Sequence, residues 1–129
     1  MKKRKLPKPT DGELAILSVL WRRGPRTVRE VYSEFNKTRV TGYTTVLKML
    51  QIMAEKGLVT RDETQRTHVY QAALAQSEAQ RWFLRDLLDR VFNGSAHRLV
   101  LQALSTQKAS AAELAEIRRL LDEMEGGRR

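Results

Sequence analysis

The fold is decided by YTTVLKMLQIMAEKGLVTRDETQRTHVY, residues 43–70 of the 129-residue chain. Apolar side chains recur at helical spacing in its first half, which predicts a helix over residues 43–56, ended by Gly57. The side chains expected to face the core of the domain are Val46, Met49, Leu50 and Met53. Two short β-prone runs follow, residues 58–61 and 68–70, on either side of a polar loop. This pattern predicts a β-hairpin directly after the helix.

Two further helices are predicted upstream, each opened by a capping box, in which a Thr and a Glu three residues later satisfy each other's backbone amides. The boxes lie at residues 10–13 and 27–30, and Gly24-Pro25 separates the two helices. Three helices followed by a hairpin are the element order of a winged helix-turn-helix. We therefore predict a mainly α fold with a small β wing, whose winged-helix domain covers residues 10–74.

The rest of the chain, residues 75–129, is predicted to be helical throughout. Capping boxes at residues 77–80 and 110–113 open the first and third of three helices. Asn93-Gly94 ends the first helix, and residues 96–104 form the second. This region follows the N-terminal winged helix-turn-helix domain as a separate C-terminal helical segment.

The apolar faces of these C-terminal helices are wider than about fifty residues can bury alone. We therefore predict a helical dimerisation region, in which the helices pack against their copies in a symmetric homodimer. The alternative is a single bundle that folds onto the winged helix. The expected dimer-interface residues are Phe83, Leu84, Leu87, Leu88, Val91, Leu99, Val100, Leu114, Ile117 and Leu121.

Positive charge is concentrated in the first half of the chain. Lys and Arg number 24 and Asp and Glu number 15, which gives a formal net charge of +9. Residues 1–70 hold 15 basic and 7 acidic side chains, whereas residues 71–129 hold 9 and 8. This imbalance indicates that the N-terminal half meets a polyanion. Nucleic acid is the expected partner, and a negatively charged membrane surface is the alternative.

The first nine residues, MKKRKLPKP, contain five basic side chains and two prolines. A segment with so little apolar surface cannot recover its ordering entropy by packing, so residues 1–9 are predicted to form a flexible basic arm. Such an arm either reaches for phosphates or is simply a solvated terminus.

The composition also argues against several classes of protein. The chain has no Cys, which excludes disulfides, thiolate metal sites and Cys nucleophiles. Its two histidines, His68 and His97, lie far apart in the sequence, and Glu13, Glu30 and Glu113 are explained as capping residues. We therefore expect no enzymatic activity, no metal and no cofactor. Without a run of about 20 apolar residues or a signal-peptide pattern, we expect a cytoplasmic protein with no membrane partner.

The predicted helix over residues 43–56 is the candidate for reading nucleic acid, because residues near the start of such a helix reach base edges. A Thr hydroxyl can donate to base or phosphate oxygens, and a Lys can reach guanine or a phosphate. The side of the helix opposite the core carries these residue types, although a solvated helix face would look the same. The candidate DNA contacts from this region are Thr41, Thr44, Thr45, Lys48 and Gln51.

The predicted hairpin adds basic and polar side chains that can bind phosphates. Asp62 and Glu63 repel phosphate, so we expect positioning contacts from the hairpin and no deep insertion of its tip. Its candidate contacts are Arg61, Arg66 and Thr67. A group of four arginines around the first two helices either lines the phosphate track or is solvated: Arg22, Arg23, Arg26 and Arg29.

Several motifs along the chain resemble those of one known family. They are Thr10-x-x-Glu13, Leu20-Trp21, Gly24-Pro25-x-Thr27-Val28-Arg29-Glu30-Val31, Tyr43-Thr44-Thr45-Val46, Lys56-Gly57-Leu58-Val59, His68-x-Tyr70, Phe92-x-Gly94-Ser95 and Ser110-x-x-Glu113-Leu114. Their order and spacing resemble the penicillinase-repressor and methicillin-resistance-repressor family. The resemblance implies a homodimeric winged-helix repressor that binds a palindromic operator, with Thr44 and Thr45 in the recognition helix.

The same resemblance implies a sensor protease or another inducer as a further partner, because these repressors must be released from DNA. Well-studied members are cut between an Asn and a Phe in the dimerisation region, and the matching place here is Gln102-Ala103. Copper-responsive relatives carry Cys pairs, which this chain lacks. Leu47 and Ile52 stand where the family often has Arg, so the base preference is expected to differ.

Together these observations lead to one hypothesis about function. The chain is expected to be a homodimeric transcriptional repressor that binds a palindromic operator in duplex DNA and controls β-lactam-resistance or other stress-response genes. One alternative is an RNA-binding winged helix, which would stack bases on exposed aromatic side chains such as Tyr43. The other is a basic protein-interaction module without sequence-specific DNA binding.

Overall fold

The computed structural model describes residues 8–127, and the chain divides into two compact units, Met1–Arg81 and Trp82–Arg129. The predicted domain bounds, with a boundary at residues 74 and 75, stay a prediction. Most of the predicted arm, residues 1–7, lies outside the described residues. Pro9, at the end of the predicted arm, is buried.

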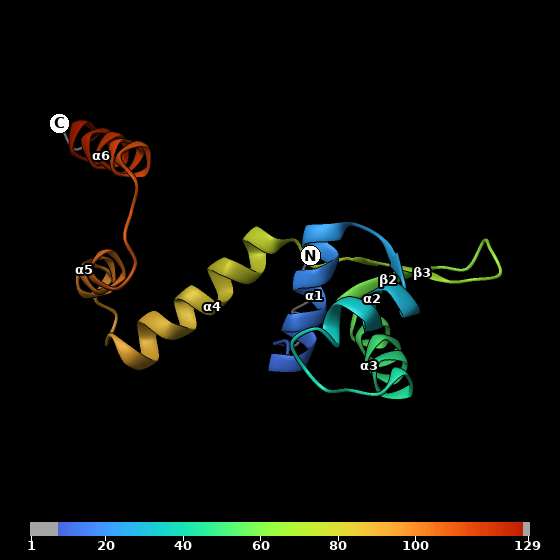
Figure 1. The fold of residues 1–129 in the computed structure, drawn as a ribbon. Helices are drawn as coiled ribbons and strands as arrows, with labels where there is room; N and C mark the ends of the chain where they lie inside the picture. Colours follow the sequence, from blue (N-terminus) through green and yellow to red (C-terminus); the bar gives the residue numbers. More distant parts are fainter. Residues whose placement is uncertain (1–7, 128–129) are drawn as a thin grey trace, which may run out of the picture. The chain divides into compact units, whose positions relative to one another are not determined.

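The first unit contains three helices that pack around one another (Figure 1): α1 (Asp11–Arg23), α2 (Val28–Phe35) and α3 (Tyr43–Lys56). The two predicted capping boxes are confirmed. The Thr10 side chain accepts from the Glu13 backbone N–H, and the Glu13 carboxylate accepts from the Thr10 backbone N–H. Thr27 and Glu30 do the same at the start of α2. Gly57, with φ 84°, ends α3 as predicted, in the left-handed conformation that Gly adopts most easily.

Three short strands form an antiparallel sheet in the order β1-β3-β2: β1 (Arg26–Thr27), β2 (Val59–Asp62) and β3 (Val69–Ala72). The predicted hairpin is confirmed, but both of its strands begin one residue later than predicted. Register decides these ends, since Val59 pairs with Ala72, and local sequence does not show register. Sequence reasoning missed β1, because two residues at the start of a helix leave no alternating pattern.

The core of the first unit lies between the three helices and the sheet. Val46, Leu50 and Met53 are fully buried as predicted, whereas Met49 is half-buried. Ile16 and Val19 of α1 also belong to the core. Helix α1 contacts both α2 and β3, so it buries a wide face. The core continues into the next segment through Leu74 and Ala79.

Helix α4 (Gln76–Val91) begins in the first unit and continues into the second, which also contains α5 (Ala96–Thr106) and α6 (Ala111–Gly126). The capping box of Ser110 and Glu113 at α6 is confirmed. The predicted cap at Ser77 is wrong, because α4 already starts at Gln76 and Ser77 lies in its first turn. None of the described residues from 82 to 127 is buried. Across residues 8–127, every helix is too short or too polar to span a lipid bilayer.

A partly buried ion pair ties α1 to the last turn of α3. The side chain of Glu13 is 7% exposed, and its Oε2 accepts a hydrogen bond of 2.7 Å from Lys56 Nζ. Burial disfavours the charged form of Glu13, but the hydrogen bonds from Lys56 and from the Thr10 backbone outweigh it. The pKa of Glu13 therefore lies below its ordinary value of 4.5. Glu13 thus serves both as a capping residue and as an anchor for α3.

Replacing Glu13 tests this anchor. Glu13→Gln keeps a side chain that can complete the capping box and removes the charge that pairs with Lys56. We expect the free energy of unfolding to fall by about 1–2 kcal/mol at neutral pH, less than for a fully buried pair because Lys56 is partly exposed. Since folding depresses the pKa of Glu13, this stabilisation is present above the ordinary value and is lost as the pH falls through the folded value. Denaturant unfolding at neutral pH and at about pH 3 measures both effects.

The matched control is Glu30→Gln, in the exposed capping box of α2, where the charge of Arg26 is the weakest of the effects on the carboxylate. We expect a smaller loss of stability in this variant. Equal losses in the two variants, or a loss in Glu13→Gln that does not change with pH, would contradict the role given to the ion pair.

Candidate nucleic-acid interface

Helix α3 has one fully buried side and one exposed side. Val46, Leu50 and Met53 are 0% exposed, which fixes the rotation of the helix about its axis. The residues that consequently face solvent include four of the predicted DNA contacts: Thr44, Thr45, Lys48 and Gln51. A row of hydroxyl, ammonium and amide groups is therefore presented on the first turns of the helix.

Thr41, the fifth contact predicted from this region, lies in the connection between α2 and α3. Its backbone N–H donates to Oδ1 of Asn36 at 2.9 Å, and the residue is half-buried. This hydrogen bond joins the two ends of the connection. Thr41 thus stands at the entrance to α3, next to Gly42, which caps the helix without a side-chain hydrogen bond.

We call the β2–β3 hairpin the wing. An open groove of about 560 Å³ lies between the wing, helix α3 and the first residues of α2. Four predicted contacts line it: Gln51 from α3 and Arg61, Arg66 and Thr67 from the wing. Thr44, Thr45 and Lys48 lie outside its lining, on the exposed side of α3. The other residues of the groove are Thr27, Val28, Arg29, Tyr43, Leu47, His68 and Tyr70.

Arg29 also lines the groove, although the sequence did not single it out from the group of four arginines around the first two helices. Its guanidinium carbon lies 5.2 Å from the centroid of the Tyr43 ring, a cation–π distance. Tyr32 in turn packs edge-on against Tyr43, with ring centroids 5.8 Å apart. These contacts hold a positive charge where α2 meets α3. They join residues far apart in the sequence, so no local motif could have indicated them.

The other three arginines of the same cluster contact groups outside the groove. Arg23 forms an ion pair of 3.1 Å with Glu34, Arg22 donates to the carbonyl of Ser18, and Arg26 donates to the carbonyl of Pro25. None of these three lines the groove. The cluster was expected either to line the phosphate track or to be solvated. The structure places only Arg29 of the four beside the candidate contacts.

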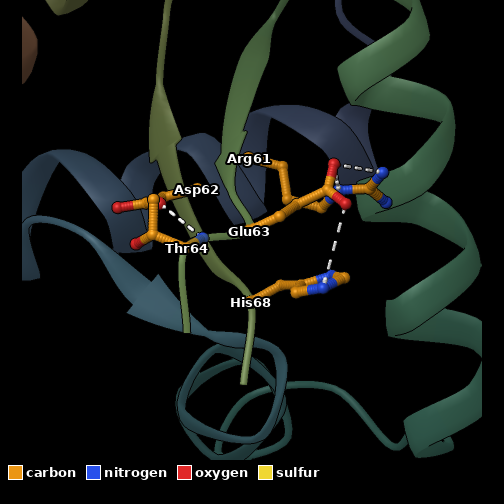
Figure 2. A network of polar contacts seen from close by, with 5 residues as sticks. All are labelled: Arg61, Asp62, Glu63, Thr64 and His68. Carbon is orange, nitrogen blue, oxygen red and sulfur yellow. Dashed lines mark hydrogen bonds and ion pairs between the residues drawn. The ribbon is translucent and has the colours of Figure 1, made fainter. Parts of the chain in front are cut away.

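The wing carries a network of polar contacts on its α3 side (Figure 2). Nε and Nη2 of Arg61 both donate to Oε2 of Glu63, at 3.1 and 2.8 Å. Hydrogen bonds with the Tyr70 side chain and with Glu63 raise the pKa of Arg61 above its ordinary value, so it carries a full positive charge. The other carboxylate oxygen of Glu63 lies 4.0 Å from Nε2 of His68. Arg61 therefore faces the groove with a carboxylate already bound.

Asp62 turns away from this network. Its Oδ1 accepts a hydrogen bond of 3.0 Å from the backbone N–H of Thr64, which closes the turn that starts the loop. The same hydrogen bond lowers the pKa of Asp62. Residues 8–127 contain no cluster of three His, Asp or Glu side chains placed to share a metal ion.

Comparison with known proteins finds similarity to penicillinase repressors over nearly the whole chain. The family model described as penicillinase repressor matches residues 9–123. The penicillinase repressor of Bacillus licheniformis is 28% identical over 120 residues, which are 93% of this chain and 94% of the relative. The transcriptional regulator BlaI of Mycobacterium tuberculosis is 32% identical over 124 residues, 95% and 89% of the two chains.

A solved structure supports the fold of the first unit. The monomeric form of Bacillus licheniformis BlaI, solved in solution in complex with the blaP half-operator, aligns with a TM-score of 0.51 and 28% identity. The alignment covers 59% of this chain and 93% of that one. With a family model that matches residues 9–123 and a relative that is 32% identical over 95% of this chain, the chain belongs to the penicillinase repressor family.

Proposed function

We propose that this chain is a homodimeric transcriptional repressor that binds a palindromic operator in duplex DNA, and that it has no enzymatic activity. The observation that carries the proposal is the exposed polar side of α3, which lies beside a groove with three arginines. This surface belongs to the half of the chain that holds nearly all of the excess positive charge. The family relationship and the half-operator complex of a relative support the same function.

In this proposal α3 enters the major groove with its first turns toward the bases. Thr44, Thr45 and Lys48 then contact base edges, with Gln51 further along the helix. Arg61, Arg66 and Thr67 bind phosphates from the wing and fix the register of the protein on the duplex. Arg29, held by Tyr43, adds a phosphate contact on the other side of the groove. Thr41 contacts the duplex from the connection before α3.

The second unit supplies the dimer in this proposal. Its described residues include many large apolar side chains, and none of them is buried within the protomer. Leu87, Val91 and Leu121 are 43%, 63% and 53% exposed, and such surface is stabilised when a copy of the same helices covers it. The other proposed interface residues are Phe83, Leu84, Leu88, Leu99, Val100, Leu114 and Ile117. Two recognition helices on one dimer then bind the two halves of a palindrome.

Duplex DNA is favoured over RNA by the surroundings of Tyr43. An RNA-binding surface would use this ring for stacking, but Arg29 lies over one face of it and Tyr32 packs edge-on against it, so only part of the 39%-exposed Tyr43 is open to a base. We further propose that the protein acts in the cytoplasm on β-lactam-resistance or other stress-response genes. A sensor protease or another inducer would release it, by a route that differs from cleavage at Asn-Phe because Gln102-Ala103 occupies the matching place.

Lys48→Ala tests the reading surface. A duplex is first selected from a random pool with the unchanged protein, and its affinity is then compared with that of a scrambled duplex at near-physiological salt. Loss of a good base contact should weaken binding to the selected duplex by about 1–3 kcal/mol and reduce the preference over the scrambled one. Lys108→Ala, which removes the same charge from an exposed position between α5 and α6, is the control and should change little. Unchanged affinity in Lys48→Ala would remove Lys48 from the reading surface.

The dimer is tested by Leu87→Asp combined with Leu121→Asp. Both side chains are exposed in the protomer, so these charges should leave the winged helix folded and still oppose pairing of the apolar faces. We expect monomers by light scattering, and weaker binding to a palindromic duplex because two half-site contacts are no longer combined. Arg119→Asp changes the net charge by the same amount on the polar side of α6 and should leave a dimer. A double variant that remains dimeric would place the interface elsewhere.

A further inference from the structure

The wing arginine that is proposed to bind phosphate is already engaged in the free protein. Arg61 directs Nε and Nη2 at one carboxylate oxygen of Glu63, at 3.1 and 2.8 Å. Figure 2 shows the Glu63 carboxylate between the Arg61 guanidinium and the His68 ring. This is the edge of the guanidinium with which arginines commonly grip carboxylates and phosphates. A DNA phosphate that reaches Arg61 therefore meets an anion in the place it would take.

We propose that Glu63 is an internal competitor of DNA phosphate for Arg61, so that Arg61 binds a phosphate of the duplex only by displacing the carboxylate of Glu63. The proposal rests on the proposed function, because it assumes that Arg61 contacts the duplex. A phosphate contact is independent of base sequence. Glu63 consequently lowers the affinity for every duplex by the same factor, and leaves the preference for the operator to the side chains of α3.

The geometry separates Glu63 from the other acidic residue of the wing. Asp62 is the residue before it, equally charged, but its carboxylate accepts from the Thr64 backbone and lies away from the Arg61 guanidinium. Glu63 is 54% exposed and Arg61 is 33% exposed, so water and phosphate can reach the pair. An exposed ion pair holds its partners only weakly, so Glu63 reduces binding and does not prevent it.

Glu63→Gln is the decisive variant, because it keeps the size of the side chain and removes the charge that competes with phosphate. We expect it to bind a selected duplex and a scrambled duplex about two- to fivefold more tightly than the unchanged protein, by equal factors. Asp62→Asn removes the same charge from the same wing and should produce a clearly smaller gain. In the Arg61→Gln background, Glu63→Gln should produce no larger gain than Asp62→Asn does, because there is no guanidinium left to release.

Three results would overturn the proposal: no gain in Glu63→Gln, equal gains in Glu63→Gln and Asp62→Asn, or a full gain in Glu63→Gln that persists without Arg61. The first would mean that Glu63 only positions Arg61, and the second that any acidic charge on the wing acts alike. Thermal unfolding of each variant shows whether the hairpin remains folded.

A measurement without DNA separates this proposal from the proposed function. Inorganic phosphate is titrated into isotope-labelled protein while the Nε–H resonance of Arg61 is followed by NMR. We expect the resonance of Glu63→Gln to respond at about two- to fivefold lower phosphate concentration than that of the unchanged protein. Identical titrations would contradict the competition. If the protein shows no preference for any duplex but the titrations differ, the proposed operator binding fails and the competition for Arg61 stands.

Discussion

The burial of one side of α3 is the constraint on which the rest of the structure depends. Val46, Leu50 and Met53 are completely enclosed, and each contributes on the order of 1.5–3 kcal/mol that would be lost if the helix rotated about its axis. The ion pair between Lys56 and Glu13 holds the end of the same helix to α1. The opposite side of α3 is therefore turned to solvent by the core itself. Stability and the proposed recognition of DNA arise from the same packing.

Local sequence signals predicted most of the first unit. The capping boxes at Thr10 and Thr27 and the spacing within α3 act within a few residues, so the sequence shows them directly. The two-residue strand β1 and the exact ends of the wing depend on pairing with β3, which no short stretch reveals. The predicted cap at Ser77 was wrong because a Ser at the start of a helix can equally lie in its first turn.

The candidate site shows the same division. Helical spacing predicts which residues of α3 face away from the core, and the wing arginines follow from the predicted hairpin. The stacking of Arg29 on Tyr43 joins two helices, so sequence alone could not select Arg29 from the arginine cluster. Likewise, the sequence predicts that Glu63 repels phosphate, but only the side-chain geometry shows that its carboxylate accepts hydrogen bonds from the Arg61 guanidinium. Contacts between elements are what the sequence leaves open.

The exposed side of α3, together with the wing, is the surface proposed to bind duplex DNA. This is tested by following the backbone amide resonances of the labelled protein while a selected duplex is added. We expect the largest changes at Thr44, Thr45 and Lys48 and at the wing, with smaller changes along α5 and α6. Changes concentrated in α5 and α6, with α3 unaffected, would contradict it.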